Sequence, residues 1–417
     1  MLPLVPDGMA HGGEAVGRAP DGRATFAAGA LPAEAIAVRI VESRRRFLRG
    51  YADETPTTPS PDRVAAPCPH FGGWPARGRS PQAWCGGCQW QHVGGDAQLR
   101  FKRSILADAL ARIGGVAAPD VRPTLAMATP WGYRNKLRTR LVGGRPGLVS
   151  VDGGRLVPLD DCPIAHPTVL EHVRAFEADL PDGLAVTFRA GSRTGDALIV
   201  IDDPDDAVGE IEVGTSASVV VVDRLGRLGI AAGRSFYVET FRGQTIGVPA
   251  TSFFQVNTEM AERLADRRAA IHRAGGRARC GRLLRDRHAD RRPRRRGGRG
   301  RRDRQRRRGD RGGDGERGRA RQRDAGRRRR GRGAGGAGRR DRRARRRSAP
   351  RWPRRGAAII LGHRPPRLVY VSCEPTTLAR DVAVLAAAGY RHRSTQPIDM
   401  FPQTFHSESV TVLDRGR

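Results

Sequence analysis

The 417-residue sequence predicts an α/β plus β fold: a small N-terminal β-barrel, a central antiparallel β region and a C-terminal α/β domain. Three observations predict it. Short apolar runs separated by glycine turns fill the first 52 residues. Alternating apolar and polar residues follow Gly132. The apolar run 367–372 leads directly into a helical pattern.

The first predicted domain, residues 1–52, consists of short strand-like runs such as 24–26 and 37–41. Asp21-Gly22 between two runs is a hairpin signal. Several short strands joined by tight turns are typical of a small barrel. Residues 53–67, rich in Pro, Thr and Asp, read as a linker.

The second predicted domain, residues 53–250, combines a helix near 97–113 with many strand-like runs. From Gly132 to Asp152 apolar and polar residues alternate around Gly-Gly and Gly-Arg-Pro-Gly turns, which indicates antiparallel strands. We expect an antiparallel β region with cysteines at both ends.

The third predicted domain, residues 251–417, begins with a helical pattern from Thr258. The run 367–372 is nearly continuously apolar, as in a strand buried on both faces of a parallel sheet. A helix follows, with Leu378, Val382 and Leu385 at positions i, i+4 and i+7 and Gly389 at its end.

The formal charge of +33 suggests nucleic acid as a partner, but its distribution is uneven. Residues 281–355 hold 35 Arg against eight acidic residues and contain no Val, Ile, Phe, Met, Tyr or Lys. Such a segment cannot bury enough apolar surface to order itself. We expect a disordered segment, and 266–356 carries no readable domain pattern.

Three interpretations of this segment compete: an Arg/Gly-rich RNA-binding tail, a solvated linker, or a GC-rich gene read out of frame. We favour the third. The whole chain has 74 Arg but only two lysines, Lys102 and Lys136, which points to a GC-rich gene.

Four cysteines form a candidate metal site: Cys68, Cys85, Cys88 and Cys162. The N-terminus lacks the charged start and the long apolar segment of a secretory signal peptide, so we expect none. We therefore expect a cytoplasmic location, where thiols stay reduced. Four thiolates suit tetrahedral zinc or a [4Fe–4S] cluster, and their spacing does not decide between them. The alternative is incidental buried cysteines.

Two residues near the C-terminus are candidate catalytic groups. Cys373 directly follows the predicted strand 367–372, at the end where open α/β sheets bind ligands. Glu408 opens the last strand-like run. The alternatives are a small core cysteine and a solvated glutamate.

A strip of alternating aromatic and basic residues follows Pro130. It can stack on bases and neutralise phosphates, so we predict RNA contacts from Trp131, Tyr133, Arg134, Lys136 and Arg138. The alternative is an ordinary solvated strand face.

Together these motifs resemble the RNA uracil-5-methyltransferase family, in particular the 23S rRNA (uracil-5-)-methyltransferases. The resemblance rests on Cys-Pro-His-Phe at 68–71, Trp-Cys-Gly-Gly-Cys-Gln-Trp-Gln-His at 84–92, Asp-Asp-Cys-Pro at 160–163, Phe-Phe-Gln-Val-Asn at 253–257, Ser-Cys-Glu-Pro at 372–375 and 399–408. The first 52 residues resemble a TRAM domain, an OB-like RNA-binding barrel.

The resemblance implies a role for each motif. The four cysteines would hold a [4Fe–4S] cluster, Cys373 would attack uracil C6, Glu408 would remove the C5 proton, and Gln255 would contact S-adenosyl-L-methionine in a Rossmann-like domain. For 253–257 the alternative is a buried phenylalanine pair with Asn257 as a helix cap. Structured RNA is the implied partner, ribosomal first and transfer RNA as the alternative, with no membrane and no obligate protein partner.

The sequence departs from the family pattern in two places. Sixteen residues, Pro69 to Trp84, separate the first two cysteines, where the family has a shorter spacer, and we expect a loop there. The glycine loop and acidic residue of a cofactor-binding domain are not readable in 266–356. An inactive RNA-binding protein and a zinc-ribbon module are therefore the alternative hypotheses.

Overall fold

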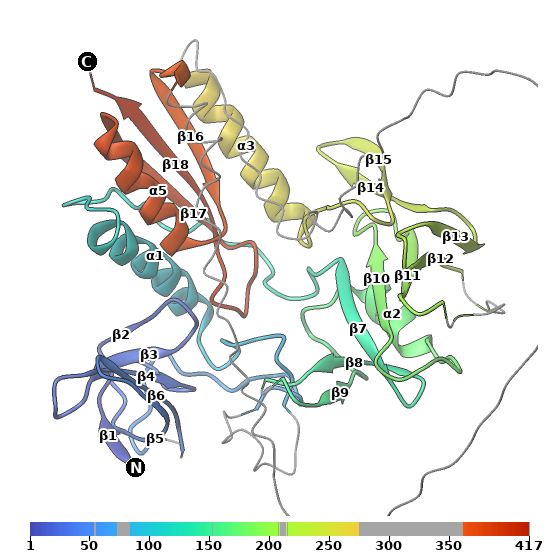
Figure 1. The fold of residues 1–417 in the computed structure, drawn as a ribbon, viewed down its shortest axis with the longest axis horizontal. Coiled ribbons are helices and arrows are strands. Elements are labelled where there is room, and N and C mark those ends of the chain that lie inside the picture. The colour runs from blue at the N-terminus through green and yellow to red at the C-terminus, as the bar shows by residue number, and fades with distance from the viewer. Residues whose placement is uncertain are drawn as a thin grey trace, which may run out of the picture. The chain divides into compact units, whose positions relative to one another are not determined.

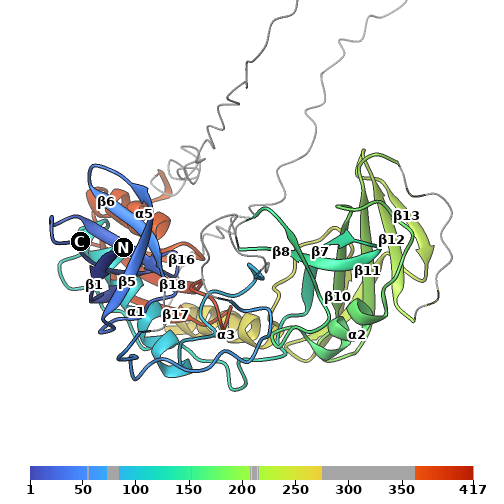
Figure 2. The ribbon, with the colours of Figure 1, turned by 90° about the horizontal axis from the view of Figure 1, so that it is seen from below.

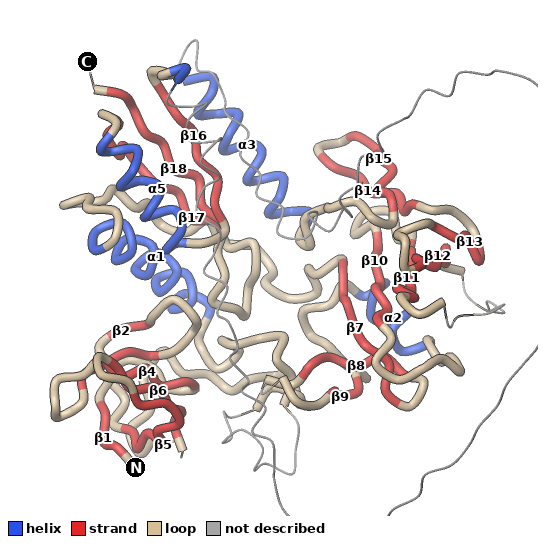
Figure 3. The backbone as a smooth tube through the Cα atoms, in the orientation of Figure 1, coloured by secondary structure: helices blue, strands red, loops and turns tan. Residues whose placement is uncertain are grey.

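In the computed structural model, the described residues are 1–53, 56–72, 84–151, 153–206, 208, 214, 216–274 and 362–416 (Figure 3). They all belong to one compact unit. The predicted disordered or out-of-frame segment 281–355 lies outside the described residues. So does most of the predicted loop between the first two cysteines, at 73–83.

The N-terminal residues form a six-stranded sheet in the order β1-β5-β6-β4-β3-β2. Side chains alternate along β5, so that Ile36 and Val38 point into a hydrophobic core that also contains Trp90 and Ile105. β1 and β2 end the strand order, and closure into a barrel remains a prediction. The strands are β1 (Leu2–Leu4), β2 (Gly8–Met9), β3 (Ala15–Arg18), β4 (Ala24–Ala28), β5 (Ile36–Ser43) and β6 (Phe47–Ala52).

The central residues form a seven-stranded sheet in the order β13-β12-β11-β10-β7-β8-β9. Every residue of its middle strand β10 is buried, and α2 (Pro167–Ala175) shares the core beside it. The strands are β7 (Lys136–Val142), β8 (Arg145–Val149), β9 (Leu156–Pro158), β10 (Ala185–Ala190), β11 (Ala197–Asp203), β12 (Ser218–Asp223) and β13 (Leu228–Ala232).

The predicted antiparallel character of this region is right except at one pair. β11 and β12 run parallel, with Leu198 opposite Ser218. Parallel neighbours need a crossover connection rather than a tight turn, and the alternation of side chains in the sequence does not report strand direction. A separate antiparallel hairpin follows, made of β14 (Phe236–Phe241) and β15 (Gln244–Pro249).

The C-terminal residues form a three-stranded sheet in the order β16-β18-β17, with helices on both faces (Figure 1). One face packs against α1 and α5, and the other against α3. The elements are α1 (Gly95–Arg112), α3 (Thr258–Ala274), β16 (Arg367–Ser372), α5 (Pro375–Ala387), β17 (Tyr390–Ile398) and β18 (Glu408–Arg415).

Among the described residues, the strand predicted at 367–372 has an antiparallel neighbour where a parallel one was expected. β16 pairs antiparallel with β18, although Val121 and Leu125 make parallel bridges to β17. Leu368 and Tyr370 are buried toward α1 and α5, while Val369 and Val371 on the other face are only half-buried. The nearly continuous apolar run therefore hid an unequal burial of the two faces.

Two helices extend the sequence-based expectations. α1 matches the helix predicted near 97–113, but it covers the C-terminal sheet although it lies within the predicted central domain, residues 53–250. α3 continues to Ala274, past the point at 266 where no pattern could be read. Within the described ranges no helix is both long and apolar enough to cross a membrane.

Candidate functional site

The end of β16 meets the beginning of β18. Ser372 and Ser409 are paired across these antiparallel strands, and the Ser409 hydroxyl donates a hydrogen bond of 3.0 Å to the Ser372 carbonyl. Cys373 follows Ser372 and Glu408 precedes Ser409, so continuing this register sets Cys373 opposite Glu408. The structure thus brings the two predicted catalytic residues to the same end of the sheet.

The two residues have opposite surroundings. Cys373 is exposed and takes part in no disulfide. Glu408 is only 8% exposed, and this burial raises the pKa of its carboxyl to about 7. A carboxylate with a pKa near neutrality can accept a proton and release it again, as a general base must.

The turn that carries Cys373 is held by its neighbours. The Ser372 hydroxyl accepts a hydrogen bond from Glu374 N at 3.2 Å. The Glu374 side chain caps α5 by accepting from the Thr376 hydroxyl at 2.9 Å and from Thr376 N. Pro375 at the first position of the helix fixes the backbone there. Cys373 therefore lies between two anchored residues.

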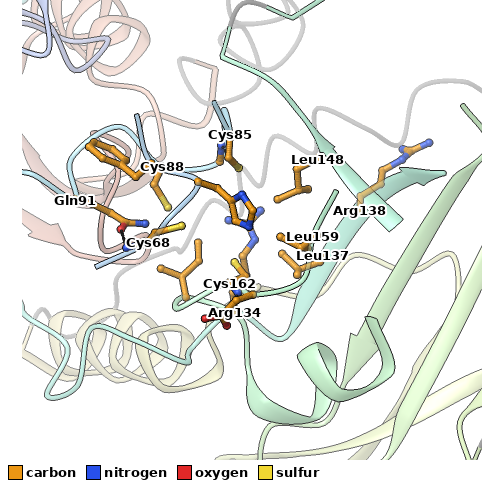
Figure 4. A pocket seen from close by; sticks show the side chains of 15 residues that line it. Cys68, Cys85, Cys88, Gln91, Arg134, Leu137, Arg138, Leu148, Leu159 and Cys162 are labelled. Atoms are coloured by element: carbon orange, nitrogen blue, oxygen red, sulfur yellow. Dashed lines mark hydrogen bonds between the residues drawn. The ribbon is translucent and has the colours of Figure 1, made fainter. Parts of the chain in front are cut away.

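The four predicted metal-binding cysteines come together around one cavity of about 140 Å³ (Figure 4). Cys68, Cys85 and Cys88 come from the loop region before α1, and Cys162 from the segment after β9. Other residues of the lining include Leu137 and Leu148 of the central sheet and the side chains of Arg134 and Arg138. The structure gathers all four thiols, despite the long insertion after Cys68.

The backbone around Cys85 is bonded to the central sheet. Gly86 N donates to Val149 O at 3.0 Å, and a Cβ on Gly86 would lie 3.0 Å from that same oxygen. A larger residue would push the segment off β8.

Burial makes the thiols poor acids in the absence of a cation. Burial above all, together with the neighbouring cysteines, raises the pKa of Cys88 to about 12 and that of Cys162 to about 11. Four thiolates would repel one another unless a positively charged group lay between them. Among the described residues, no set of three or more His, Cys, Asp or Glu is arranged around a single ion.

Gln255 lies at the junction between the central sheet and α3. Its carbonyl accepts from Asn135 Nδ2 at 3.1 Å, and Asn135 N donates to Val256 O at 2.9 Å. Asn135 Nδ2 also donates to the Thr258 hydroxyl at 3.0 Å. The half-buried Gln255 side chain is thus presented from a fixed backbone.

The alternative interpretation of this motif is half right. Asn257 caps α3, since Met260 N donates to its side-chain oxygen at 3.1 Å. The phenylalanine pair is not buried, because Phe253 is 57% exposed while Phe254 packs edge-on against Phe241.

Comparison with known proteins supports a common origin over nearly the whole chain. No protein-family model matches the chain. An uncharacterized RNA methyltransferase of Gloeobacter violaceus is 30% identical, over 98% of this chain and 95% of the relative. One of Streptomyces coelicolor is 30% identical, over 97% and 91%. One of Halalkalibacterium halodurans is 28% identical, over 97% and 95%.

The chain belongs to the RNA methyltransferase family.

A solved structure has the same fold. It is the tRNA (uracil-54, C5)-methyltransferase of Pyrococcus abyssi in complex with S-adenosyl-L-homocysteine, with a TM-score of 0.59, 16% identity, and coverage of 99% of this chain and 100% of that chain. The recognition made from the motifs is confirmed, since relatives and structure are consistent with the RNA uracil-5-methyltransferase family. An α/β methyltransferase fold is confirmed as well.

The predicted RNA-binding strip of this methyltransferase does not lie on one surface. Tyr133 is 4% exposed and its hydroxyl donates to Pro402 O at 2.9 Å, so its ring presents almost no surface for stacking. Trp131 packs partly on the central core. The strip mixes loop and strand residues, and alternation along the sequence did not reveal which of them face inward.

Two basic residues of the strip, Arg134 and Arg138, both line the cysteine cavity. The Arg138 guanidinium points away from the cysteines and is ion-paired with Asp202 at 2.6 Å (Figure 4). Lys136, at the start of β7, is half-buried. Burial and then the nearby Arg189 and other arginines lower its pKa to about 8.

Sequence reasoning missed a buried lysine in the methyltransferase. Lys102 on α1 is fully buried and its Nζ lies 2.5 Å from Asp399 Oδ1 and 3.0 Å from Phe401 O. It ties α1 to the motif that ends at Glu408. The sequence could have drawn attention to this residue, since Lys102 is one of only two lysines in a chain that otherwise uses arginine.

Proposed function

We propose that this RNA methyltransferase transfers a methyl group to C5 of uracil in RNA, with Cys373 as the nucleophile and Glu408 as the base. The observation that carries the proposal is the pairing of Ser372 with Ser409, which brings the thiol and a buried carboxyl to one end of the sheet. The pKa of about 7 for Glu408 supports its role as a base.

Uracil C5 is a weak nucleophile, and the proposed residues overcome this in two steps. The Cys373 thiolate adds to C6, and the π electrons of the C5–C6 bond move into the carbonyl to give an enolate. C5 of the enolate takes up the methyl group. Glu408 then removes the C5 proton, the double bond re-forms, and the thiolate leaves.

S-adenosyl-L-methionine, when bound, supplies the electrophilic methyl group. The S-adenosyl-L-homocysteine in the structural neighbour and the methyltransferase relatives support this cofactor. Gln255 is the described residue that we propose to contact it. Its backbone is fixed by Asn135, so its side chain can present an amide without reorganisation.

The cysteine cavity fits a [4Fe–4S] cluster. Four thiols line one cavity, and a cluster takes one cysteine on each of its four irons. We propose that Cys68, Cys85, Cys88 and Cys162 hold it. The cluster would join the loop before α1 to the central sheet and so serve a structural role.

The RNA is proposed to be ribosomal, with transfer RNA as the alternative, and the enzyme to work in the cytoplasm. Uracils within structured RNA must be turned out of the stack to meet a thiolate. Methylation of only one class, when rRNA and tRNA transcripts are compared, identifies the substrate.

Incubation of the full chain with labelled S-adenosyl-L-methionine and RNA tests the proposal. We expect label on uracil C5, reduced to background by Cys373→Ala. Glu408→Gln should accumulate a denaturant-resistant protein–RNA adduct, because the C5 proton cannot leave. Val384→Ala, at an exposed position on α5, is the matched control and should methylate normally.

The absence of label with every RNA would overturn the enzymatic proposal. Tight RNA binding under those conditions would favour the inactive RNA-binding protein. That alternative draws on the unreadable cofactor motifs in 266–356 and on the Arg/Gly-rich segment.

A further inference from the structure

The loop between β2 and β3 of the N-terminal sheet touches three motifs around the candidate nucleophile. Trp90 Nε1 donates a hydrogen bond of 3.1 Å to Gly13 O. The His11 ring packs edge-on against Phe405, with 5.4 Å between ring centroids. His11 Nε2 lies 2.8 Å from Glu374 Oε1. One loop thus reaches the cysteine motif, the C-terminal motif and the nucleophile motif.

The loop fits closely against these segments. Gly13 has a φ of +85°, and a Cβ there would lie 3.0 Å from Phe405 Cδ1 and 3.3 Å from Trp90 Nε1. Only glycine adopts this backbone at this distance without strain. Ala10 N donates to Glu14 O at 2.8 Å and closes the loop. His11 is therefore carried by a loop with little freedom to move.

His11 acts on the residue next to Cys373. Burial by itself would raise the pKa of Glu374, but hydrogen bonds and charge from His11 and Thr376 outweigh it, and the pKa is about 2. The Glu374 carboxylate is therefore shared between His11 and the cap of α5. Its backbone is bonded to the Ser372 hydroxyl. Movement of this carboxylate would move the turn that contains Cys373.

We propose that His11 is a positioning residue for Cys373: by holding the Glu374 carboxylate from the N-terminal sheet, it fixes the turn that presents the thiol at the start of α5. The catalytic consequence rests on the proposed function, whereas the geometric part does not. The N-terminal sheet is then a component of the catalytic site as well as a candidate RNA-binding domain.

The reactivity of Cys373 toward iodoacetamide, followed by peptide-resolved mass spectrometry on the full chain, tests the geometry without RNA or cofactor. The positive end of a helix favours the thiolate. Loosening the turn in His11→Ala should slow alkylation by about tenfold, the scale of one hydrogen bond to a charged group. His11→Gln keeps a donor toward Glu374 and should restore the rate. His363→Ala, at an exposed histidine, is the matched control.

Methylation kinetics then separate positioning from binding. His11→Ala should lower kcat and leave the KM for RNA unchanged, since His11 touches Glu374 rather than the substrate. Wild-type alkylation and kcat in His11→Ala would overturn the positioning role while leaving the proposed function intact. Equal loss in His11→Gln and His11→Ala would also overturn it. Slowed alkylation in His11→Ala with no methylation by any protein, wild type included, would keep the positioning role and reject the proposed function.

Discussion

Lys102 Nζ and Asp399 Oδ1 lie 2.5 Å apart, with both side chains buried. Burial lowers the pKa of Lys102, and the Asp399 carboxylate opposes that shift. The pair joins α1 to the segment that leads to Glu408, so each charge is tolerable only while the other is present.

Removing one member of this pair should be costly. We expect Lys102→Met to lower the free energy of unfolding by about 3 kcal/mol or more, because it leaves the Asp399 carboxylate buried and unpaired. Urea denaturation measures it. Lys102→Met combined with Asp399→Asn should recover part of the loss. Arg112→Met breaks the exposed pair with Asp108 on the same helix and should change stability by less than about 1 kcal/mol. A similar small effect for Lys102→Met would contradict the importance of the buried pair.

Glu408 should make stability and activity respond to pH in opposite directions. Its folded pKa of about 7 lies above the ordinary value of 4.5, so between these values the folded protein holds a proton that the unfolded chain releases. Stability should therefore fall as pH rises from 4.5 to about 7. Methylation should rise over the upper part of this range, because a base must be deprotonated.

The comparison with Glu408→Gln isolates this contribution. The variant cannot ionise at this position. The difference in unfolding free energy between it and the wild type should therefore change from pH 4.5 to about 7 and stay constant above that range. A difference that is constant from pH 4.5 to 8 would show that Glu408 titrates normally.

The cysteine cavity predicts a coloured protein. Purified without oxygen, the chain should be brown and contain about four iron and four sulfide per molecule. Cys88→Ser should lose most of the iron and unfold more easily. Cys373→Ser, at the exposed cysteine, should keep its iron and the stability of the wild type. One zinc per chain in a colourless protein would contradict the cluster and favour the zinc alternative.

The predicted RNA-binding strip contains buried and exposed residues, so its members should affect RNA binding differently. Arg138→Ala should weaken RNA binding and reduce the dependence of affinity on salt by about one ion. Tyr133→Phe should leave affinity unchanged and cost about 1 kcal/mol of stability, since it loses the bond to Pro402 O. Arg227→Ala removes a similarly exposed, ion-paired arginine and is the control. Equal affinity and salt dependence for Arg138→Ala and wild type would remove this residue from the interface.

Sequence patterns predicted helices, because a helix depends on residues that are close together in the sequence. The helix from Pro375 to Ala387 follows from its apolar spacing and the glycine that ends it, and α1 lies where a helix was expected near 97–113. The gathering of four distant cysteines was expected through the family resemblance, since nothing in their spacing brings Cys162 near Cys68. The direction of β16 relative to its neighbours could not be predicted, because an apolar run reads alike in parallel and antiparallel sheets.

Contacts between distant segments lay beyond the sequence patterns. His11 and Glu374 are separated by more than three hundred residues, and no periodicity connects a glycine-rich turn with a helix cap. Asn135 was read as part of a basic strip, but its neighbours in space are Gln255 and Thr258. Whether residues 266–356 are read in frame depends on the nucleotide sequence, and resequencing codons 260–360 answers it.

The placement of α1 has a consequence for dividing the chain into fragments. A cut near residue 250 would remove the helix that covers Leu368 and Tyr370, and with it the Val121 and Leu125 bridges along β17. It would also break the bonds from Asn135 to the start of α3. A fragment that keeps these contacts is therefore discontinuous, and it must carry residues 95–135 alongside the chain from Gln255 onward.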